Sequence, residues 1–171
     1  MKKIAWGMTG AGHLLEECVN LALSLSNVDV FLSRAAEEVI GMYHLESRLS
    51  LVHVVRDNTY SAPVAGRFAR GIYSALIIAP ATSNSVAKFV CGISDSLITN
   101  LFAQAGKSQV PIVVLPTDIA PEMDSRDPGG NIIKVYPRPV DLENVEKLRQ
   151  FPGVTVVRNI EELQGWLNIY L

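Results

Sequence analysis

Residues 75–88 read Ala-Leu-Ile-Ile-Ala-Pro-Ala-Thr-Ser-Asn-Ser-Val-Ala-Lys and carry the clearest structural signal in the chain. The apolar run 75–79 has the length of a buried strand, and it leads into a turn with three hydroxyl groups and one amide. A helix is expected to follow from Ser85, and the amino end of a helix attracts anions. In open α/β sheets, nucleotides bind at the carboxyl ends of the strands. The segment therefore predicts a strand, a polar loop and a helix that hold a phosphorylated cofactor.

Short apolar runs alternate with amphipathic segments along most of the chain, a pattern typical of strands and helices that follow one another. We expect strands at residues 4–8, 28–32, 51–55, 75–79, 110–115 and 154–157. We expect helices at residues 14–26, 35–43, 67–71, 85–105, 142–150 and 160–167, the fourth of them broken at Gly92. This order predicts one α/β domain over residues 1–171, Rossmann-like (flavodoxin-like), with helices on both faces of a parallel sheet.

Residues 117–131 interrupt this pattern, because they include two prolines, two adjacent glycines and several acidic residues. A loop of this length in a compact domain is usually functional or mobile. We therefore expect a mobile loop near 117–131 that closes over a bound ligand and excludes water. The next residues, 132–136, are expected to be extended.

The composition excludes several classes of protein. Of 171 residues, 49% are hydrophobic and 19% are charged, so the chain can bury a core and is not a disordered segment. Fifteen basic and seventeen acidic residues give a net charge of −2, which predicts no nucleic-acid partner. No apolar run has the length of a membrane span or of a signal peptide. Cys18 and Cys91 have no metal-ligand spacing and suit a reducing compartment, so we expect a cytoplasmic protein without a metal.

The turn after the first expected strand is a second candidate phosphate site. Gly10 and Gly12 begin the Gly-x-Gly-x-x-Gly pattern of dinucleotide-binding proteins, but Leu15 stands at the third glycine position. The acidic residue that would hold a ribose is also absent, and Ser33-Arg34 follows the second strand instead. An NADP site is one reading of this turn, and a simple tight turn is another. The reading we favour is that Thr9, Gly10 and Ser33 together hold one terminal phosphate.

Together these segments resemble the flavoprotein family, which includes flavin-containing cysteine decarboxylases, flavin prenyltransferases and archaeal-type flavoproteins such as dihydromethanopterin reductase. In that family the block after the fourth strand reads approximately Pro-Ala-Ser-Ala-Asn-Thr, then Ala-Lys, then Gly-Ile-Ala-Asp-Asn-Leu. This chain has Pro80-Ala81-Thr82-Ser83-Asn84-Ser85, then Ala87-Lys88, then Gly92-Ile93-Ser94-Asp95-Ser96-Leu97. The resemblance covers roughly residues 1–118 and implies an FMN-binding domain in a homo-oligomer built from trimers.

Departures from the family pattern narrow the expected activity. Cysteine decarboxylases of the family carry a histidine shortly before the fourth strand, and this chain has none between Asn58 and Ser74. They also carry Pro-x-Met-Asn after the fifth strand, where this chain has Pro116-Thr117-Asp118-Ile119. Both differences argue against cysteine decarboxylation, and the arginine and glutamate arrangement typical of prenyltransferases is not evident here. The chain as a whole is most similar to the dihydromethanopterin reductase-like flavoproteins.

The resemblance implies FMN as the cofactor and assigns residues to it. The phosphate end would be held by Thr9, Gly10, Ala11 and Ser33. The ribityl chain and the ring edge would be contacted by Thr82, Ser83, Asn84 and Ser85. The expected cofactor-binding set also includes Ala81, Thr117 and Asp118.

Two further residues are candidates for contacts with substrate or with a neighbouring subunit. Lys88 lies one turn into the helix and is expected either to face the flavin or to pair with a carboxylate of the next subunit. His13 follows the first turn, where a local hydrogen bond at the start of a helix would also account for it. Asp95 is expected to cap the helix that begins near Ser96. No side chain is identified as catalytic.

The resemblance implies an FMN-dependent oxidoreductase that reduces a dihydropterin, and dihydromethanopterin is the substrate we expect. Two cysteines cannot ligate a Cys₄ iron–sulfur cluster, so a separate donor, a nicotinamide or a redox protein, would supply the electrons. An electron-transfer flavoprotein without its own small-molecule substrate would have the same cofactor loops, so this second function stays open. A flavin prenyltransferase-like enzyme and direct nicotinamide binding at Gly10-Ala11-Gly12 are weaker hypotheses that the sequence also leaves open.

Overall fold

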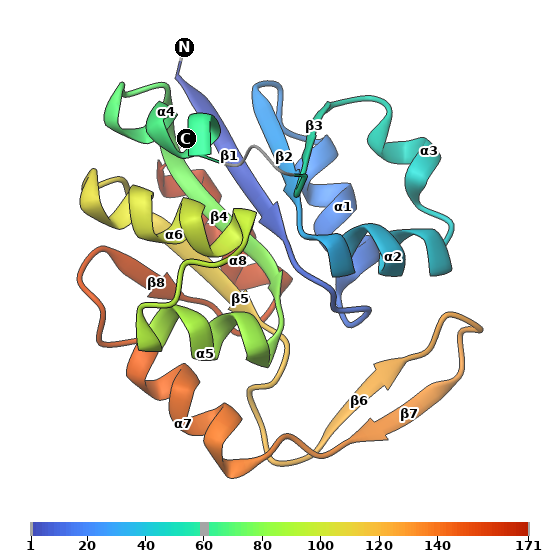
Figure 1. Cartoon of the computed structure of the whole chain (residues 1–171). Coiled ribbons are helices and arrows are strands. Elements are labelled where there is room, and N and C mark those ends of the chain that lie inside the picture. Colours follow the sequence, from blue (N-terminus) through green and yellow to red (C-terminus); the bar gives the residue numbers. More distant parts are fainter. Residues whose placement is uncertain (1, 59–61, 171) are drawn as a thin grey trace.

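The expected apolar runs form one six-stranded sheet at the centre of the molecule (Figure 1). The computed structural model describes residues 2–58 and 62–170. Neighbouring strands of the sheet are all parallel, in the order β3-β2-β1-β4-β5-β8. These strands are β1 (Lys3–Met8), β2 (Val28–Leu32), β3 (His53–Arg56), β4 (Tyr73–Ala81), β5 (Ile112–Pro116) and β8 (Val154–Val156). The prediction of a Rossmann-like α/β fold is confirmed.

Helices cover both faces of the sheet (Figure 1). One core contains side chains of α1 (Leu15–Leu23), α2 (Arg34–Met42), α3 (Glu46–Leu49) and α8 (Ile160–Tyr170). The other contains side chains of α4 (Ala62–Ala69), α5 (Ser83–Cys91), α6 (Leu97–Lys107) and α7 (Pro139–Leu148). Successive side chains of a strand point to opposite faces, so Trp6 packs in the first core and its neighbour Ala5 in the second. Among the described helices, none is both long and apolar enough to cross a membrane.

Gly92 divides the helical region after β4, as predicted. Its φ of 71° lies in the left-handed region, which glycine adopts without strain, and it ends α5 at Cys91. Ser96 then starts α6 with a capping box, in which its side chain accepts a hydrogen bond from the amide of Thr99. The expectation that Asp95 caps this helix is wrong, because Ser96 occupies the cap position and Asp95 pairs with Lys88 instead.

Several element ends differ from those expected. β4 does not stop at residue 79 but continues through Pro80 to Ala81, because its last residue still pairs with Pro116 of β5. β3 begins at His53 rather than at residue 51, and Leu51 lies in a turn with 79% of its surface exposed. The four-residue helix α3 was not expected, since one turn is too short to show a helical period.

The segment 117–131 is not one irregular loop. Within it β6 (Met123–Arg126) pairs antiparallel with β7 (Ile132–Val135), and the two strands form a hairpin that projects from the body of the molecule (Figure 1). β6 was not expected, because its four residues, Met-Asp-Ser-Arg, lack the β-branched and aromatic residues typical of strands. The mobility of this segment stays a prediction.

A buried carboxylate joins four strands at the amino edge of the sheet. The Asp29 side chain on β2 is 1% exposed, and it accepts hydrogen bonds of 2.7 Å from Lys3 Nζ on β1 and from the Tyr73 hydroxyl on β4. Nδ1 of His53 on β3 lies 3.2 Å from Oδ1 of Asp29. Burial acts to raise the pKa of Asp29, but the hydrogen bonds from Lys3 and Tyr73 outweigh it and hold the pKa below its ordinary value.

Replacing this carboxylate tests how far the network stabilises the sheet. We expect Asp29→Asn to lower the free energy of unfolding at pH 7 by about 1–3 kcal/mol, because the amide cannot replace the charge-assisted hydrogen bonds. The pKa of Asp29 is lower in the folded than in the unfolded chain, so the carboxylate stabilises the fold fully above about pH 4. That contribution is lost as the pH falls through the folded-state pKa. Urea unfolding at pH 7 and pH 3 should show a smaller difference between wild type and variant at pH 3, and equal differences would contradict the assignment.

Candidate functional site

A cavity of about 570 Å³ opens at the carboxyl edge of the sheet, and we call it the switch-point cavity. From β1 the chain proceeds outward through β2 and β3, and it returns to the other side of β1 to continue through β4 and β5. The order of strands therefore reverses between β1 and β4, the position at which open α/β sheets bind ligands. The cavity is lined by Thr9, Gly10, Ser33, Arg34, Ala35, Asp57, Thr82, Asn84, Ser85, Lys88, Asp95 and Ser96.

Three helices begin at this cavity. Ser33, Thr82 and Ser96 are the N-cap residues of α2, α5 and α6, and all three line the cavity wall. Each side chain accepts a hydrogen bond from an amide three residues further on, which explains why serine and threonine occupy these positions. The helix dipoles add positive potential at each amino end. The cavity is therefore suited to an anionic group.

Backbone amides at two of these helix starts have no hydrogen-bond partner within the part of the chain that the structure describes. They are the amides of Arg34 and Ala35 in α2, and those of Ser83 and Asn84 in α5. Amides of the first helical turn cannot bond within the helix, and they commonly bind phosphate groups. These backbone amides are hydrogen-bond donors that can bind a phosphate monoester although they carry no charge, so the site does not need a dedicated lysine.

The hydroxyl of Thr9 ties the ends of β1 and β4 together. Thr9 is 2% exposed, and its Oγ1 donates to the carbonyl of Pro80 at 3.0 Å and accepts from the amide of Thr82 at 2.8 Å. The backbone of Thr9 also donates to the Pro80 carbonyl. This hydroxyl is thus committed within the fold, and it orients the start of α5 rather than reaching into the cavity.

Gly10 allows the turn after β1 to lie directly on α2. A Cβ atom at Gly10 would overlap the Cβ of Ala35, so only glycine permits this approach. The close packing brings the Gly10 backbone beside the amino end of α2. This is the structural role of the first glycine of the turn, and it requires no dinucleotide.

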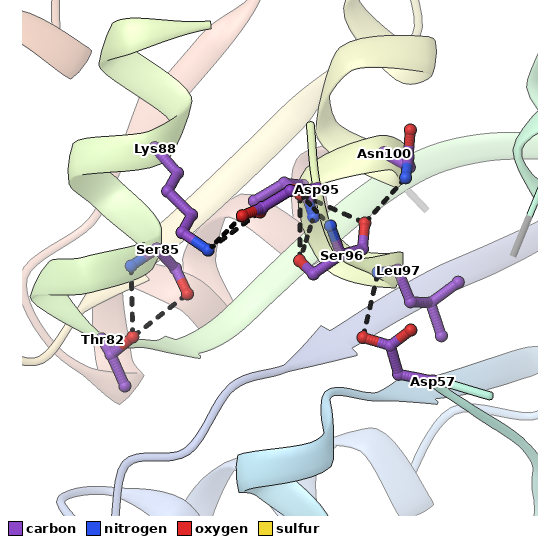
Figure 2. A network of polar contacts seen from close by, with 9 residues as sticks. Asp57, Thr82, Ser85, Lys88, Asp95, Ser96, Leu97 and Asn100 are labelled. Carbon is purple, nitrogen blue, oxygen red and sulfur yellow. Dashed lines mark hydrogen bonds and ion pairs between the residues drawn. The ribbon is translucent and has the colours of Figure 1, made fainter. Parts of the chain in front are cut away.

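The charged groups of the cavity largely neutralise one another (Figure 2). Lys88 Nζ on α5 contacts both carboxylate oxygens of Asp95, at 2.8 and 2.9 Å. The Lys88 ammonium holds the pKa of Asp95 below its ordinary value. Asp57, just after β3, accepts a hydrogen bond of 3.1 Å from the amide of Leu97 at the start of α6. Lys88 thus pairs with a carboxylate of its own chain, which was not expected, and its expected contact with the flavin or with the next subunit stays a prediction.

Three of the expected cofactor-binding residues are engaged in the loop that follows the cavity. The hydroxyl of Ser83 donates to the carboxylate of Asp118, and the buried hydroxyl of Thr117 donates to the carbonyl of Ala81 at 3.3 Å. These bonds fasten the segment after β5 to the start of α5. These bonds position the loop, and Ser83, Thr117 and Asp118 themselves do not line the switch-point cavity.

A second cavity of about 250 Å³ lies beside the first, and we call it the hairpin cavity. It is enclosed by the start of α1, the end of α2 and the β6–β7 hairpin, and Tyr43 closes it by donating a 2.7 Å hydrogen bond to the Arg126 carbonyl. Its lining residues are Gly12, His13, Leu14, Glu16, Glu17, Tyr43, Asp124, Ser125, Arg126 and Ile132. Burial lowers the pKa of His13, although the nearby carboxylates of Glu17 and Asp118 act in the opposite direction.

The structure gathers most of the expected site residues and separates the rest. Thr9, Gly10, Ser33, Thr82, Asn84, Ser85 and Lys88 line the switch-point cavity, whereas His13 lines the hairpin cavity. Ala81 is buried in β4, and Ala11 lines neither cavity but lies between Gly10 and Gly12 in the turn after β1. Asp57 was not expected here, although an acidic residue just after an expected strand was a usable signal. Tyr43 was not expected either, since its partner Arg126 is 83 residues away.

The described part of the chain has no group of three histidine, cysteine, aspartate or glutamate residues that could hold a metal ion. Among the described residues that line the two cavities, no serine or cysteine is activated by an adjacent base. The arrangement is therefore able to bind and orient a phosphorylated cofactor, and the bond-making chemistry would come from that cofactor.

Comparisons with known proteins agree with this geometry. A family model named Flavoprotein matches residues 1–166. The chain superposes with a TM-score of 0.90 on Burkholderia xenovorans DmrB, crystallised in complex with FMN and described as a cubic protein cage for redox transfer. The two chains are 42% identical, and the match covers 98% of this chain and 94% of that chain.

Two curated relatives are named dihydromethanopterin reductase (acceptor). The protein of Methanosarcina mazei is 40% identical over 88% of this chain, and that of Methanocaldococcus jannaschii is 43% identical over 68% of it. The chain spans only 66% and 53% of the lengths of these two relatives.

The Thr9 link between β1 and β4 can be removed without changing the shape of the side chain. We expect Thr9→Val to lower the free energy of unfolding by about 1–3 kcal/mol, because the Pro80 carbonyl and the Thr82 amide lose a buried partner. Thr155→Val on β8 is the matched control, since Thr155 is exposed, and it should change stability by less than about 0.5 kcal/mol. Urea unfolding of both variants checks this, and equal effects would show that the Thr9 hydroxyl is not a structural link.

Proposed function

Because the chain belongs to the Flavoprotein family, we propose that it is an FMN-dependent oxidoreductase that reduces dihydromethanopterin to tetrahydromethanopterin. The observation that carries this proposal is the switch-point cavity of about 570 Å³, which is lined by Arg34, Ala35 and Asn84, residues whose amides have no hydrogen-bond partner among the described residues. That volume lies within the roughly 300–1,000 Å³ typical of sites for ligands of this size. The 42% identity to an FMN-binding protein along nearly the whole chain supports the same cofactor.

The residues of the cavity divide naturally between the parts of the cofactor. The phosphate is held at the start of α2, by the amides of Arg34 and Ala35 beside Gly10 and the Ser33 cap. The ribityl chain and the ring lie along the start of α5, where Asn84 and Ser85 line the cavity. When bound, FMN supplies hydride chemistry at its ring. The protein residues bind and orient the cofactor and form a second cavity beside it.

The reaction adds two electrons and two protons across a carbon–nitrogen double bond of the substrate. The electrons come from a separate donor, a nicotinamide or a redox protein, and reach the substrate through the flavin. A reductase is favoured over a pure electron carrier, because a ring-sized cavity adjoins the cofactor cavity. A carrier would need only an accessible flavin edge.

The oligomeric state and the cellular location of the protein are also part of the proposal. The relative DmrB is described as a cage, and we propose that this chain is likewise a homo-oligomer, with trimers as its building units. The exposed apolar residues Ile133 and Tyr136, on and just after β7, would be covered by such contacts. A cytoplasmic location is proposed as well, which the two free thiols of Cys18 and Cys91 suit.

The assignment of the cofactor cavity predicts a loss of flavin on mutation. Asn84→Ala should weaken FMN binding about 5- to 10-fold, because the variant loses one hydrogen-bonding side chain in the cavity. Asn168→Ala, an exposed position on α8, is the control and should bind FMN like the wild type. Titration of the apoprotein with FMN, followed by flavin fluorescence, measures both. An unchanged Kd in Asn84→Ala would place the flavin elsewhere.

The reductase activity predicts that substrate reoxidises the flavin. Anaerobic stopped-flow mixing of photoreduced holoprotein with dihydromethanopterin should restore the absorbance of oxidised FMN in a single kinetic phase. Tetrahydromethanopterin should form in a 1:1 ratio to the flavin oxidised. A flavin that stays reduced in excess dihydromethanopterin but is oxidised by a redox protein would identify an electron carrier instead.

A further inference from the structure

The hairpin cavity lies at the carboxyl edge of the sheet, and the cofactor assignment places no part of FMN in it. It lies near the switch-point cavity, since Gly10 lines one, Gly12 lines the other, and only Ala11 separates them in the chain. Asp118 lines neither cavity, but it accepts a hydrogen bond from Ser83, whose neighbours Thr82 and Asn84 line the switch-point cavity, and it acts electrostatically on His13 of the hairpin cavity. A ligand in the hairpin cavity would therefore lie next to the cofactor.

The shape of the hairpin cavity limits what it can hold. Its volume of about 250 Å³ is below the roughly 300–1,000 Å³ of sites for whole drug-sized ligands, so it suits one small ring system. Leu14 and Ile132 provide apolar walls for the faces of such a ring. The walls also approach one another closely: a Cβ atom at Gly12 would overlap the ring of Tyr43.

The polar groups of this cavity favour a ligand rich in N–H donors. Three carboxylates line it, and two of them already have cationic partners: Glu16 pairs with Arg48 at 3.3 Å and Asp124 with Lys134 at 3.0 Å. Glu17, in the first turn of α1, has no ion pair among the described residues. Its carboxylate is thus available to accept hydrogen bonds from a ligand.

We propose that the hairpin cavity binds the 2-amino-4-oxopyrimidine ring of the dihydropterin, and that the Glu17 carboxylate accepts hydrogen bonds from its N3–H and 2-amino groups. These two parallel donors have the geometry of the guanidinium fork, which pairs with carboxylates through two hydrogen bonds. His13 provides a further polar contact on the same wall. This inference rests on the proposed function, and it adds the residue that recognises the substrate.

A pair of small analogues tests the contact directly. Isothermal titration of oxidised, FMN-loaded protein is performed anaerobically with 6-methyl-7,8-dihydropterin and with 6-methyl-7,8-dihydrolumazine, in which oxygen replaces the 2-amino group. The wild type should bind the pterin about 10- to 100-fold more tightly than the lumazine, because a hydrogen bond from the 2-amino group to a charged carboxylate is replaced by an oxygen–oxygen contact. Glu17→Gln should lose most of this preference, because its affinity for the pterin falls while its affinity for the lumazine stays about the same.

Two controls make the outcome specific. FMN affinity should be unchanged in Glu17→Gln, because Glu17 does not line the switch-point cavity. Glu38→Gln removes an exposed carboxylate from α2 outside both cavities and should bind both analogues like the wild type.

The results separate this inference from the proposed function. If dihydromethanopterin reoxidises the flavin but Glu17→Gln keeps the full preference for the pterin, Glu17 is not the recognition residue and the inference is wrong. An equal affinity of the wild type for both analogues overturns it as well. If the wild-type holoprotein neither binds dihydropterin nor is reoxidised by dihydromethanopterin, the inference and the proposed function both fail.

Discussion

The junction between the ends of β1 and β4 is the constraint on which the rest of the carboxyl edge depends. At this edge the chain does not run directly from one parallel strand to its neighbour. The loops that leave neighbouring strands are therefore held together by hydrogen bonds from side chains or between backbone groups. Here the buried hydroxyl of Thr9 bonds both the carbonyl of Pro80 and the amide of Thr82. It thereby sets where α5 begins relative to the turn after β1. Because the strand order reverses at this point, the two departing loops leave space between them for a ligand.

The donors that this edge offers to a ligand are helix starts rather than charged side chains. Capping serines and threonines at Ser33, Thr82 and Ser96 satisfy one amide each and leave the earliest amides of α2 and α5 directed outward. The two cationic side chains of the cavity already have partners. Lys88 forms an ion pair with Asp95, and Arg34 donates a hydrogen bond to the backbone carbonyl of Asp57. The proposed phosphate site thus consists of fixed neutral donors, whose positions do not depend on long flexible side chains.

The two cavities at this edge are built differently and suit different ligands. The larger one is formed by regular elements of the sheet and its helices, which suits a cofactor that stays bound. The smaller one is closed by the β6–β7 hairpin, held to the end of α2 by the hydrogen bond from Tyr43 to the Arg126 carbonyl. A hairpin attached at few points can open more easily than a core element, which suits a substrate that must enter and leave.

The sequence by itself determined the features that depend on neighbours in the chain. The run 75–79 followed by Thr82, Ser83 and Asn84 indicated a strand, a polar loop and a helix, and Gly92 marked the helix break, because each signal acts within a few residues. Only the tertiary structure decided contacts between distant segments. The pairing of residues 123–126 with 132–135 lacks a strong strand signal, and the Tyr43–Arg126 bond spans 83 residues, so neither the hairpin nor its cavity could be foreseen. Such contacts arise where packing of the whole chain brings polar groups together, and no local propensity encodes them.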